Sequence, residues 1–292
     1  MSIVSVAEAV PNRLFAIYGT LLSRNSGEKS ERLKEQMVPK SLRGGRDNQS
    51  TALFDASLRE ARNIGLIVED ADTYSVATEA QPKPQQPEEE AFRTYVLNVL
   101  YDQAFKDESS QSKVAPALAW LLMQNPLRPI PWSENPLQIT VRQLGEGNAY
   151  DLTNAPRLQT LAYWARYLGF ARLIGAGEVF IVPDPHDAIA RLLPDVFGNA
   201  APLRATEFRK RLSDLCPLLE DGLVRTRIER QALGETGRSN SQRLSRTTSL
   251  ALVRLESCGR IQLEQRSDAE VNLLDLGTSE RRFSHISIAV RQ

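Results

Sequence analysis

One stretch, residues 243–264 (RLSRTTSLALVRLESCGRIQLE), contains three structural signals in a fixed order. Apolar side chains recur at every third position from Leu252 to Cys258, the spacing of one stripe on an α-helix. Gly259 follows at the point where a residue in the left-handed conformation would end the helix. Residues 261–264 then alternate between apolar and polar, as in a half-buried strand. The stretch therefore predicts a helix, a glycine stop and a strand.

The same order occurs at two other glycines, Gly65 and Gly169. Apolar residues stand seven, four and one positions before each of them, and apolar strand segments follow. After Gly169 the two strand segments are separated by the glycine-rich residues 175–177, which predicts a hairpin. A helix that ends at glycine and leads directly into a hairpin is typical of a winged helix-turn-helix domain. We therefore predict an α+β, helix-rich fold made of three tandem winged helix-turn-helix domains.

Spacing and composition set the predicted domain boundaries. The three glycines lie roughly a hundred residues apart, which is too far for a solenoid and suits small domains. Residues 81–90 combine prolines with polar and acidic residues and form the predicted linker. The predicted domains are a winged-helix domain at 1–80, a middle winged-helix domain with extra helices at 91–200, and a C-terminal winged-helix domain at 201–292. Within the middle domain, residues 137–141 are predicted to form a strand.

Composition excludes several classes of protein. The 36 basic residues balance the 36 acidic ones, which argues against charge-driven coating of nucleic acid, although residues 203–292 carry 16 basic and 12 acidic side chains. No apolar run approaches the roughly 18 residues of a membrane span, and the first residues lack the features of a signal peptide. Cys216 and Cys258 stand in apolar settings and are expected to be buried free thiols. We expect a cytoplasmic protein that does not bind membranes.

The sequence lacks the common motifs of enzymes and metal sites. It contains neither the GxxxxGK[ST] phosphate loop nor the GxGxxG fingerprint. His186 and His285 are its two histidines, and neither has a cysteine or a second histidine at ligand spacing. We therefore expect no catalytic residue, no metal and no cofactor, and we interpret the protein as a non-enzyme.

The start of the third glycine-ended helix is the strongest candidate for a DNA contact. A hydroxyl at position 245 or 247 is the expected N-cap, because it can accept a hydrogen bond from a free amide of the first turn. Two cations and three hydroxyls gather at the helix end that meets DNA in helix-turn-helix docking. These predicted contact residues are Arg243, Ser245, Arg246, Thr247 and Thr248. Two other interpretations stay open: a capped helix with solvated arginines, and a protein interface formed by Leu250 and Val253.

The other two glycine-ended helices supply further candidates. Asn48, Gln49 and Ser50 begin the first of them and are residue types that read base edges or bind phosphate, but they also cap helices. Arg157 begins the second, which carries three aromatic residues within positions 163–167. Such rings stack on bases or pack on a neighbouring domain, and both interpretations stay open.

Three segments of the sequence resemble one known group of proteins. PNRLFAIYGTLL at 11–22, NQSTALFDASLREARNIGLI at 48–67 and SRTTSLALVRLESCGRI at 245–261 are similar to the multi-winged-helix accessory proteins of bacterial defence islands. Within that group the chain resembles the DpdG family, from the cluster that inserts 7-deazaguanine bases into DNA. The resemblance implies a non-catalytic part of a DNA modification–restriction system that works beside helicases and nucleases.

We therefore predict a non-catalytic, DNA-associated component of a bacterial modification–restriction or anti-phage defence system. Its expected partners are DNA and the protein subunits of a defence complex. A transcriptional regulator and a protein-interaction scaffold are the two alternatives. A regulator would bind one operator specifically, whereas the wings of a scaffold would bind partner subunits. The zero net charge and the aromatic middle helix favour the scaffold.

Overall fold

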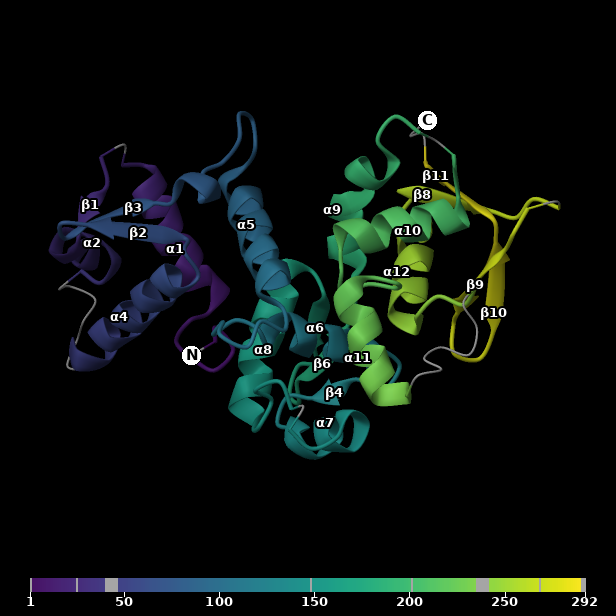
Figure 1. The fold of residues 1–292 in the computed structure, drawn as a ribbon, viewed down its shortest axis with the longest axis horizontal. Helices are drawn as coiled ribbons and strands as arrows, with labels where there is room; N and C mark the ends of the chain where they lie inside the picture. Colours follow the sequence, from purple (N-terminus) through teal and green to yellow (C-terminus); the bar gives the residue numbers. More distant parts are fainter. Residues whose placement is uncertain are drawn as a thin grey trace. The chain divides into compact units, whose positions relative to one another are not determined.

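The computed structural model describes residues 2–24, 26–39, 47–147, 149–200, 202–234, 242–267 and 269–289, without the side chains of residues 47–50. The fold is α+β and rich in helices, with small sheets (Figure 1). Residue contacts divide the chain into two compact units, Met1–Val114 and Ala115–Gln292. The three domains delimited from the sequence stay a prediction. Within the described ranges, every helix is too short or too polar to span a membrane.

The first unit is a bundle of helices beside a small antiparallel sheet. Its elements are α1 (Pro11–Leu22), β1 (Glu28–Lys29), α2 (Ser30–Met37), α4 (Asp47–Asn63), β2 (Ile67–Asp70), β3 (Thr73–Val76), the 3-10 helix η2 (Thr78–Ala80) and α5 (Glu88–Gln103). The strands are ordered β1-β3-β2. The apolar stripes of α1, α4 and α5 meet in the core, where the Tyr18 and Phe92 rings lie 5.4 Å apart between centroids.

The second unit contains two successive groups of helices and strands. The first group consists of α6 (Val114–Met123), β4 (Ile130–Pro131), α7 (Pro136–Leu144), α8 (Ala155–Leu168), β5 (Ala171–Ile174) and β6 (Phe180–Pro183). The second group consists of α9 (His186–Phe197), β7 (Leu203–Arg204), α10 (Ala205–Leu215), α11 (Leu223–Leu233), α12 (Arg246–Ser257), β8 (Ile261–Glu264), β9 (Asn272–Asp275), β10 (Glu280–Phe283) and β11 (His285–Ile288). Trp120, Trp164 and Phe208 are among its largest fully buried side chains.

One order of elements recurs three times along the chain. A helix is followed by a two-residue strand, a second helix, a third helix and two antiparallel strands, as in α1-β1-α2-α4-β2-β3 and α6-β4-α7-α8-β5-β6. The last repeat, α9-β7-α10-α12-β8-β11, adds α11 before its third helix and the hairpin β9–β10 between its last strands. In each sheet the last strand lies between the other two, since the orders are β1-β3-β2, β4-β6-β5 and β7-β11-β8.

The third helix of each repeat ends in the same hydrogen-bond pattern. Gly65, Gly169 and Gly259 all have positive φ, at 68°, 86° and 63°. Each glycine amide donates to the carbonyl three residues back, and the next amide donates to the carbonyl five residues back at 2.9, 2.7 and 2.9 Å respectively. This is the Schellman motif, which satisfies carbonyls that a helix end leaves free. The glycine stops predicted from the sequence are therefore confirmed at all three positions.

Two local predictions are wrong. Residues 137–141 form part of α7 and not a strand, because Asn135 caps this helix by accepting from the Leu137 amide at 3.2 Å and Pro136 occupies its first position. Cys258 is exposed and not buried, because α12 ends at Ser257 and the chain turns away at the following glycine. The other thiol, Cys216, is buried as predicted.

A buried carboxylate in the first unit makes stability depend on pH. Glu60 on α4 is 2% exposed, and its Oε2 atom has no hydrogen-bond partner among the described residues. Burial raises the pKa of Glu60 above its ordinary value, while Asn63 and Arg59 act in the opposite direction. Because the ionised form is disfavoured in the folded state, this side chain lowers stability once the pH rises above its folded pKa.

Glu60→Gln is therefore expected to raise the free energy of unfolding at pH 7 by about 1 kcal/mol. The gain should vanish near pH 4, where both the folded and the unfolded carboxyl are largely protonated. Urea unfolding of the two proteins at both pH values measures this difference. Glu35→Gln, on the exposed side of α2, is the control and should show no such change between the two pH values. If Glu60→Gln were less stable than the wild type at pH 7, the inference that the ionised Glu60 carboxylate destabilises the fold would be wrong.

Candidate nucleic-acid interface

The predicted contact residues at the start of α12 are organised around one cap. Ser245 is the N-cap, and its Oγ accepts from the Thr248 amide at 3.3 Å. The Ser245 hydroxyl also donates to the Glu220 carboxylate at 2.7 Å, and the Ser245 amide points to the same carboxylate at 3.2 Å. Glu220 is 1% exposed. A buried carboxylate of the protein itself thus occupies the region where a helix N-terminus would bind an external anion.

The other hydroxyls of this region face the interior of the unit. Thr247 and Thr248 are 2% and 0% exposed. The Thr247 hydroxyl donates to the carbonyl of Leu122 on α6 at 3.0 Å, and the Ser249 hydroxyl accepts from the Asp275 amide on β9 at 2.9 Å. These hydroxyls hold the start of α12 against α6 and the β9–β10 hairpin, so the predicted DNA contact in this region would have to come from the two arginines.

Arg243 and Arg246 converge on one carboxylate. Asp275 pairs with Arg246 at 3.2 Å and with Arg243 at 3.4 Å, and Arg243 also lies 3.2 Å from Glu280. Partial burial acts to raise the pKa of Asp275, but the Gly277 amide and the two arginines outweigh it and hold that pKa below its ordinary value. The arginine side chains keep 41% and 29% of their surface exposed. Both are accessible, and both are already neutralised in part.

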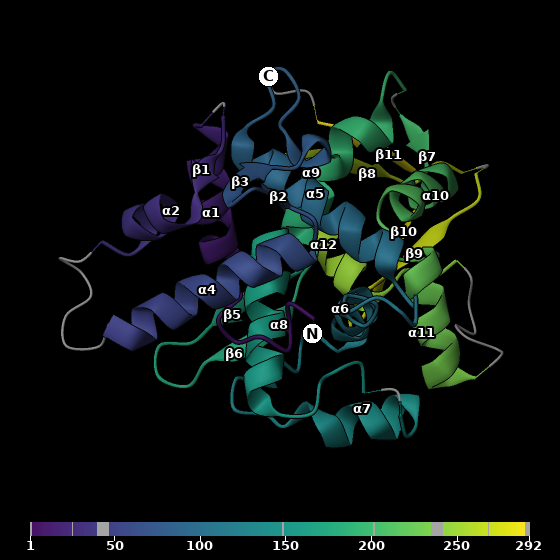
Figure 2. The same cartoon turned by 60° about the vertical axis from the view of Figure 1, so that its left-hand side comes forward.

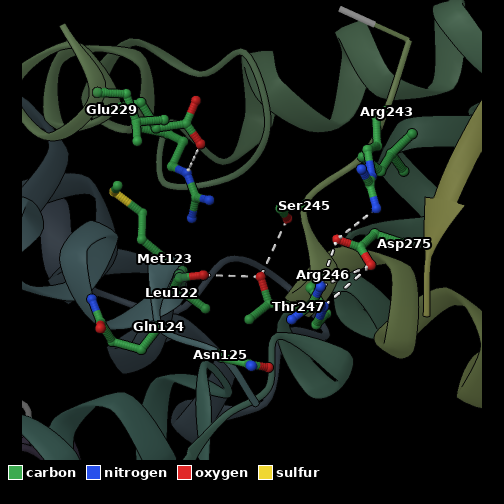
Figure 3. Close-up of a pocket in the computed structure, with 13 residues that line it drawn as sticks. Leu122, Met123, Gln124, Asn125, Glu229, Arg243, Ser245, Arg246, Thr247 and Asp275 are labelled. Atoms are coloured by element: carbon green, nitrogen blue, oxygen red, sulfur yellow. Dashed lines mark hydrogen bonds and ion pairs between the residues drawn. The ribbon is translucent and has the colours of Figure 1, made fainter. Parts of the chain in front are cut away.

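These groups form the wall of a pocket of about 500 Å³ (Figure 3). Arg243, Ser245, Arg246 and Thr247 line it together with the end of α6, part of α11 and Asp275 on β9. Figure 3 shows Arg243 and Arg246 on either side of Asp275, with Thr247 between Ser245 and the Leu122 carbonyl. On the α11 wall, Arg225 donates to Glu229, and both side chains are almost fully buried. Charge inside the pocket is therefore largely compensated by carboxylates of the protein.

The remaining predicted residues lie elsewhere. Arg157 is in the first turn of α8, where its Nη1 atom donates to the Asp151 carbonyl at 3.1 Å, and the N-cap of that helix is Asn154. It does not line the pocket that holds Arg243. Asn48, Gln49 and Ser50 belong to the first turn of α4 in the backbone, but their side chains lie outside the described residues. The structure thus gathers the α12 residues into one site and leaves Arg157 outside it.

The sequence alone did not indicate the two carboxylates of this site, and it left open whether the aromatic residues of α8 stack on bases or pack on a neighbouring domain. Glu220 and Asp275 are about thirty residues or fewer from the helix start they neutralise, and no spacing rule relates them to it. On α8 the aromatic cluster divides, since Trp164 is fully buried while Tyr163 is 43% exposed. The Tyr163 ring contacts Trp132, with centroids 5.3 Å apart. The sequence does carry one signal for this surface, the positive charge balance of residues 155–183.

Within the described ranges, no group of three or more histidine, cysteine or acidic side chains is arranged to hold a metal ion. His186 lies at the start of α9, where its Nδ1 atom is 2.7 Å from Asp187. His285 lies on β11, where it stands opposite Glu264 of β8 in the antiparallel strand register. Neither histidine stands beside the pocket at α12.

Comparison with known proteins identifies a family. No match was found among curated proteins or solved structures. The model of one family, described as DpdG-like, matches residues 1–269. The match spans all of the first unit and most of the second, including α12 and β8. The chain therefore belongs to the DpdG-like family.

Proposed function

We propose that this protein is a non-catalytic, DNA-associated winged-helix component of a bacterial DNA modification–restriction system. The observation that carries the proposal is the element order repeated three times, each with a Schellman-ended third helix that leads into antiparallel strands. That order is the one expected for a winged helix-turn-helix domain, whose third helix and hairpin contact DNA. Membership of the DpdG-like family supports the association with DNA modification.

At α12 the DNA contact is assigned to Arg243 and Arg246. Both guanidinium groups remain partly exposed, and Arg suits bidentate contacts with phosphate. Each contact has to compete with Asp275, which lies within 3.4 Å of both arginines. The two arginines are therefore expected to contribute less to phosphate neutralisation than two free cations would.

DNA binding measured across a salt series tests the proposal. The wild-type protein is expected to bind DNA at low salt with an affinity that falls steeply as salt rises. Arg243→Ala/Arg246→Ala should reduce the slope of log affinity against log salt by about one, because Asp275 already satisfies part of the charge. Arg142→Ala, an exposed arginine on α7, is the control and should leave the slope unchanged.

Absence of wild-type binding at low salt would reject DNA association and favour the second candidate, a protein-interaction scaffold. One observation supports that alternative, since Glu220, Asp275 and Glu280 of the chain itself surround the α12 start. In a scaffold, these carboxylates would neutralise the start of α12, and the helix would support the fold without contacting DNA. Capture of partner subunits by the full chain would then be the decisive measurement.

A further inference from the structure

The three repeats differ in the charge of the segment that would face DNA. From third helix to last strand, residues 47–76 carry two basic and six acidic side chains, whereas residues 246–288 carry six of each. Residues 155–183 of the middle repeat carry three arginines and one glutamate, and so form the segment with a positive balance. Charge complementarity to a phosphate backbone therefore favours the middle repeat.

Two of these arginines are exposed and stand close to the end of α8. Arg166 lies three positions after Tyr163, so the two side chains share one face of the helix. Arg172 is exposed on β5, the strand that packs against α8 (Figure 2). Neither arginine makes an ion pair with any described residue, in contrast to Arg243 and Arg246. Their charge is available to an external anion.

An aromatic pair adjoins Arg166, because one of its rings belongs to Tyr163, three positions earlier on α8. The Trp132 and Tyr163 rings meet edge to face, with an interplanar angle of 74°. The Trp132 amide donates to the Val179 carbonyl of the β5–β6 hairpin at 2.8 Å, and its carbonyl accepts from Gln159 on α8 at 3.2 Å. These hydrogen bonds fix the pair between the helix and the hairpin, while Tyr163 keeps 43% of its surface exposed. An ordered, exposed ring offers a stacking surface at little cost in conformational entropy.

We propose that Trp132, Tyr163, Arg166 and Arg172, here named the Tyr163 patch, bind single-stranded DNA. The arginines would contact phosphates while Tyr163 stacks on an unpaired base. A base inside a duplex is stacked on its neighbours, so its face is not available to Tyr163, and this selects single strands over duplexes. The inference rests on the proposed DNA association and specifies the form of DNA and the repeat that binds it.

Tryptophan fluorescence gives a direct readout of this patch. The chain has three tryptophans, and Trp120 and Trp164 are 0% exposed whereas Trp132 is half-buried. Quenching by a thymidine oligonucleotide therefore reports on Trp132, and Trp132→Phe should remove the quenching while binding persists. Affinity is measured in parallel with a labelled oligonucleotide and with a duplex of equal length.

Tyr163→Ala is expected to weaken binding of the single strand about tenfold and to leave the salt slope unchanged. Tyr163→Phe, which keeps the ring, should bind like the wild type. Arg166→Ala/Arg172→Ala should reduce the salt slope for the single strand by about 1.4, that is about 0.7 for each phosphate contact, and Arg142→Ala on α7 should not change it. Thermal unfolding of each variant verifies that it is folded. Because the replaced side chains are exposed, we expect the variants to fold, and a loss of binding then reports on the patch itself.

The outcomes separate this inference from the proposed function. If wild-type protein binds DNA but Tyr163→Ala binds the single strand equally well and Trp132 is not quenched, the Tyr163 patch is rejected and DNA association stands. If duplex is preferred over single strand in all variants, the patch is rejected as well. If the wild type binds neither form at low salt, both proposals fall.

Discussion

Gly169→Ala is expected to lower the free energy of unfolding by about 3 kcal/mol, whereas Gly259→Ala should cost about 1 kcal/mol. Both glycines end a third helix with positive φ, at 86° and 63°, so alanine carries the same backbone penalty at each. The surroundings differ. A Cβ at Gly169 would lie 2.8 Å from the Ala188 amide nitrogen and 2.5 Å from an Arg191 guanidinium nitrogen, whereas at Gly259 nothing lies within 4 Å.

The contact at Gly169 involves backbone that has little room to move. The Ala188 amide donates to the Gly169 carbonyl at 3.1 Å, which ties the first turn of α9 to the end of α8. A methyl group between them would have to break or lengthen this hydrogen bond. Chemical denaturation of the two full-length variants measures the difference, and Gly259→Ala serves as the matched control for the backbone penalty. Equal losses in the two variants would show that α9 shifts to accommodate the methyl group.

The repeated helix ends were predictable because their signal is local. Three apolar residues at helical spacing, followed by glycine and a strand, specify a Schellman end through side chains and backbone within about ten residues of one another. The Ser245 cap was predictable for the same reason, since its hydroxyl reaches an amide three residues on. The two-residue strands β1, β4 and β7 were not, because each is defined by pairing with a strand at least 44 residues away.

The state of the candidate site was less predictable than its fold. The sequence shows that Arg246 and Thr247 stand in the first turn of a helix, but the groups that engage them come from distant elements. Asp275 is 29 residues from Arg246, and Leu122 is 125 residues from Thr247. At α7, a capping asparagine and a proline at the first helical position outweighed the β propensity of residues 139–141. The helix therefore forms there because Asn135 and Pro136, both visible in the sequence, favour a helix start more strongly than the following residues favour a strand.

Breaking the ion pair on the α11 wall of the pocket is expected to cause the second large loss of stability. Arg225 and Glu229 keep 5% and 11% of their side-chain surface exposed, so both charges are removed from water. Arg225→Ala is expected to cost about 3–5 kcal/mol of unfolding free energy, because it leaves the Glu229 carboxylate desolvated without this guanidinium. Arg266→Ala is the control. The side chains of Arg266 and Glu264 in this control pair keep 50% and 44% of their surface exposed, so breaking the pair should cost less than about 1 kcal/mol of unfolding free energy.

Replacing both partners distinguishes the value of the pair from the cost of breaking it. Arg225→Met/Glu229→Leu restores apolar packing of similar volume and should recover most of the stability lost in Arg225→Ala. A double variant as unstable as the single one would show that Arg225 or Glu229 makes a further contact that apolar groups cannot replace. The same variants report on the site, because the two residues share the pocket wall with Arg243 and Arg246. Suppose that the double variant is stable and binds DNA with an unchanged salt dependence. That result would show that Arg225 and Glu229 serve the packing of α11 beside the start of α12. DNA contact in this region would then be left to the two arginines that flank Asp275.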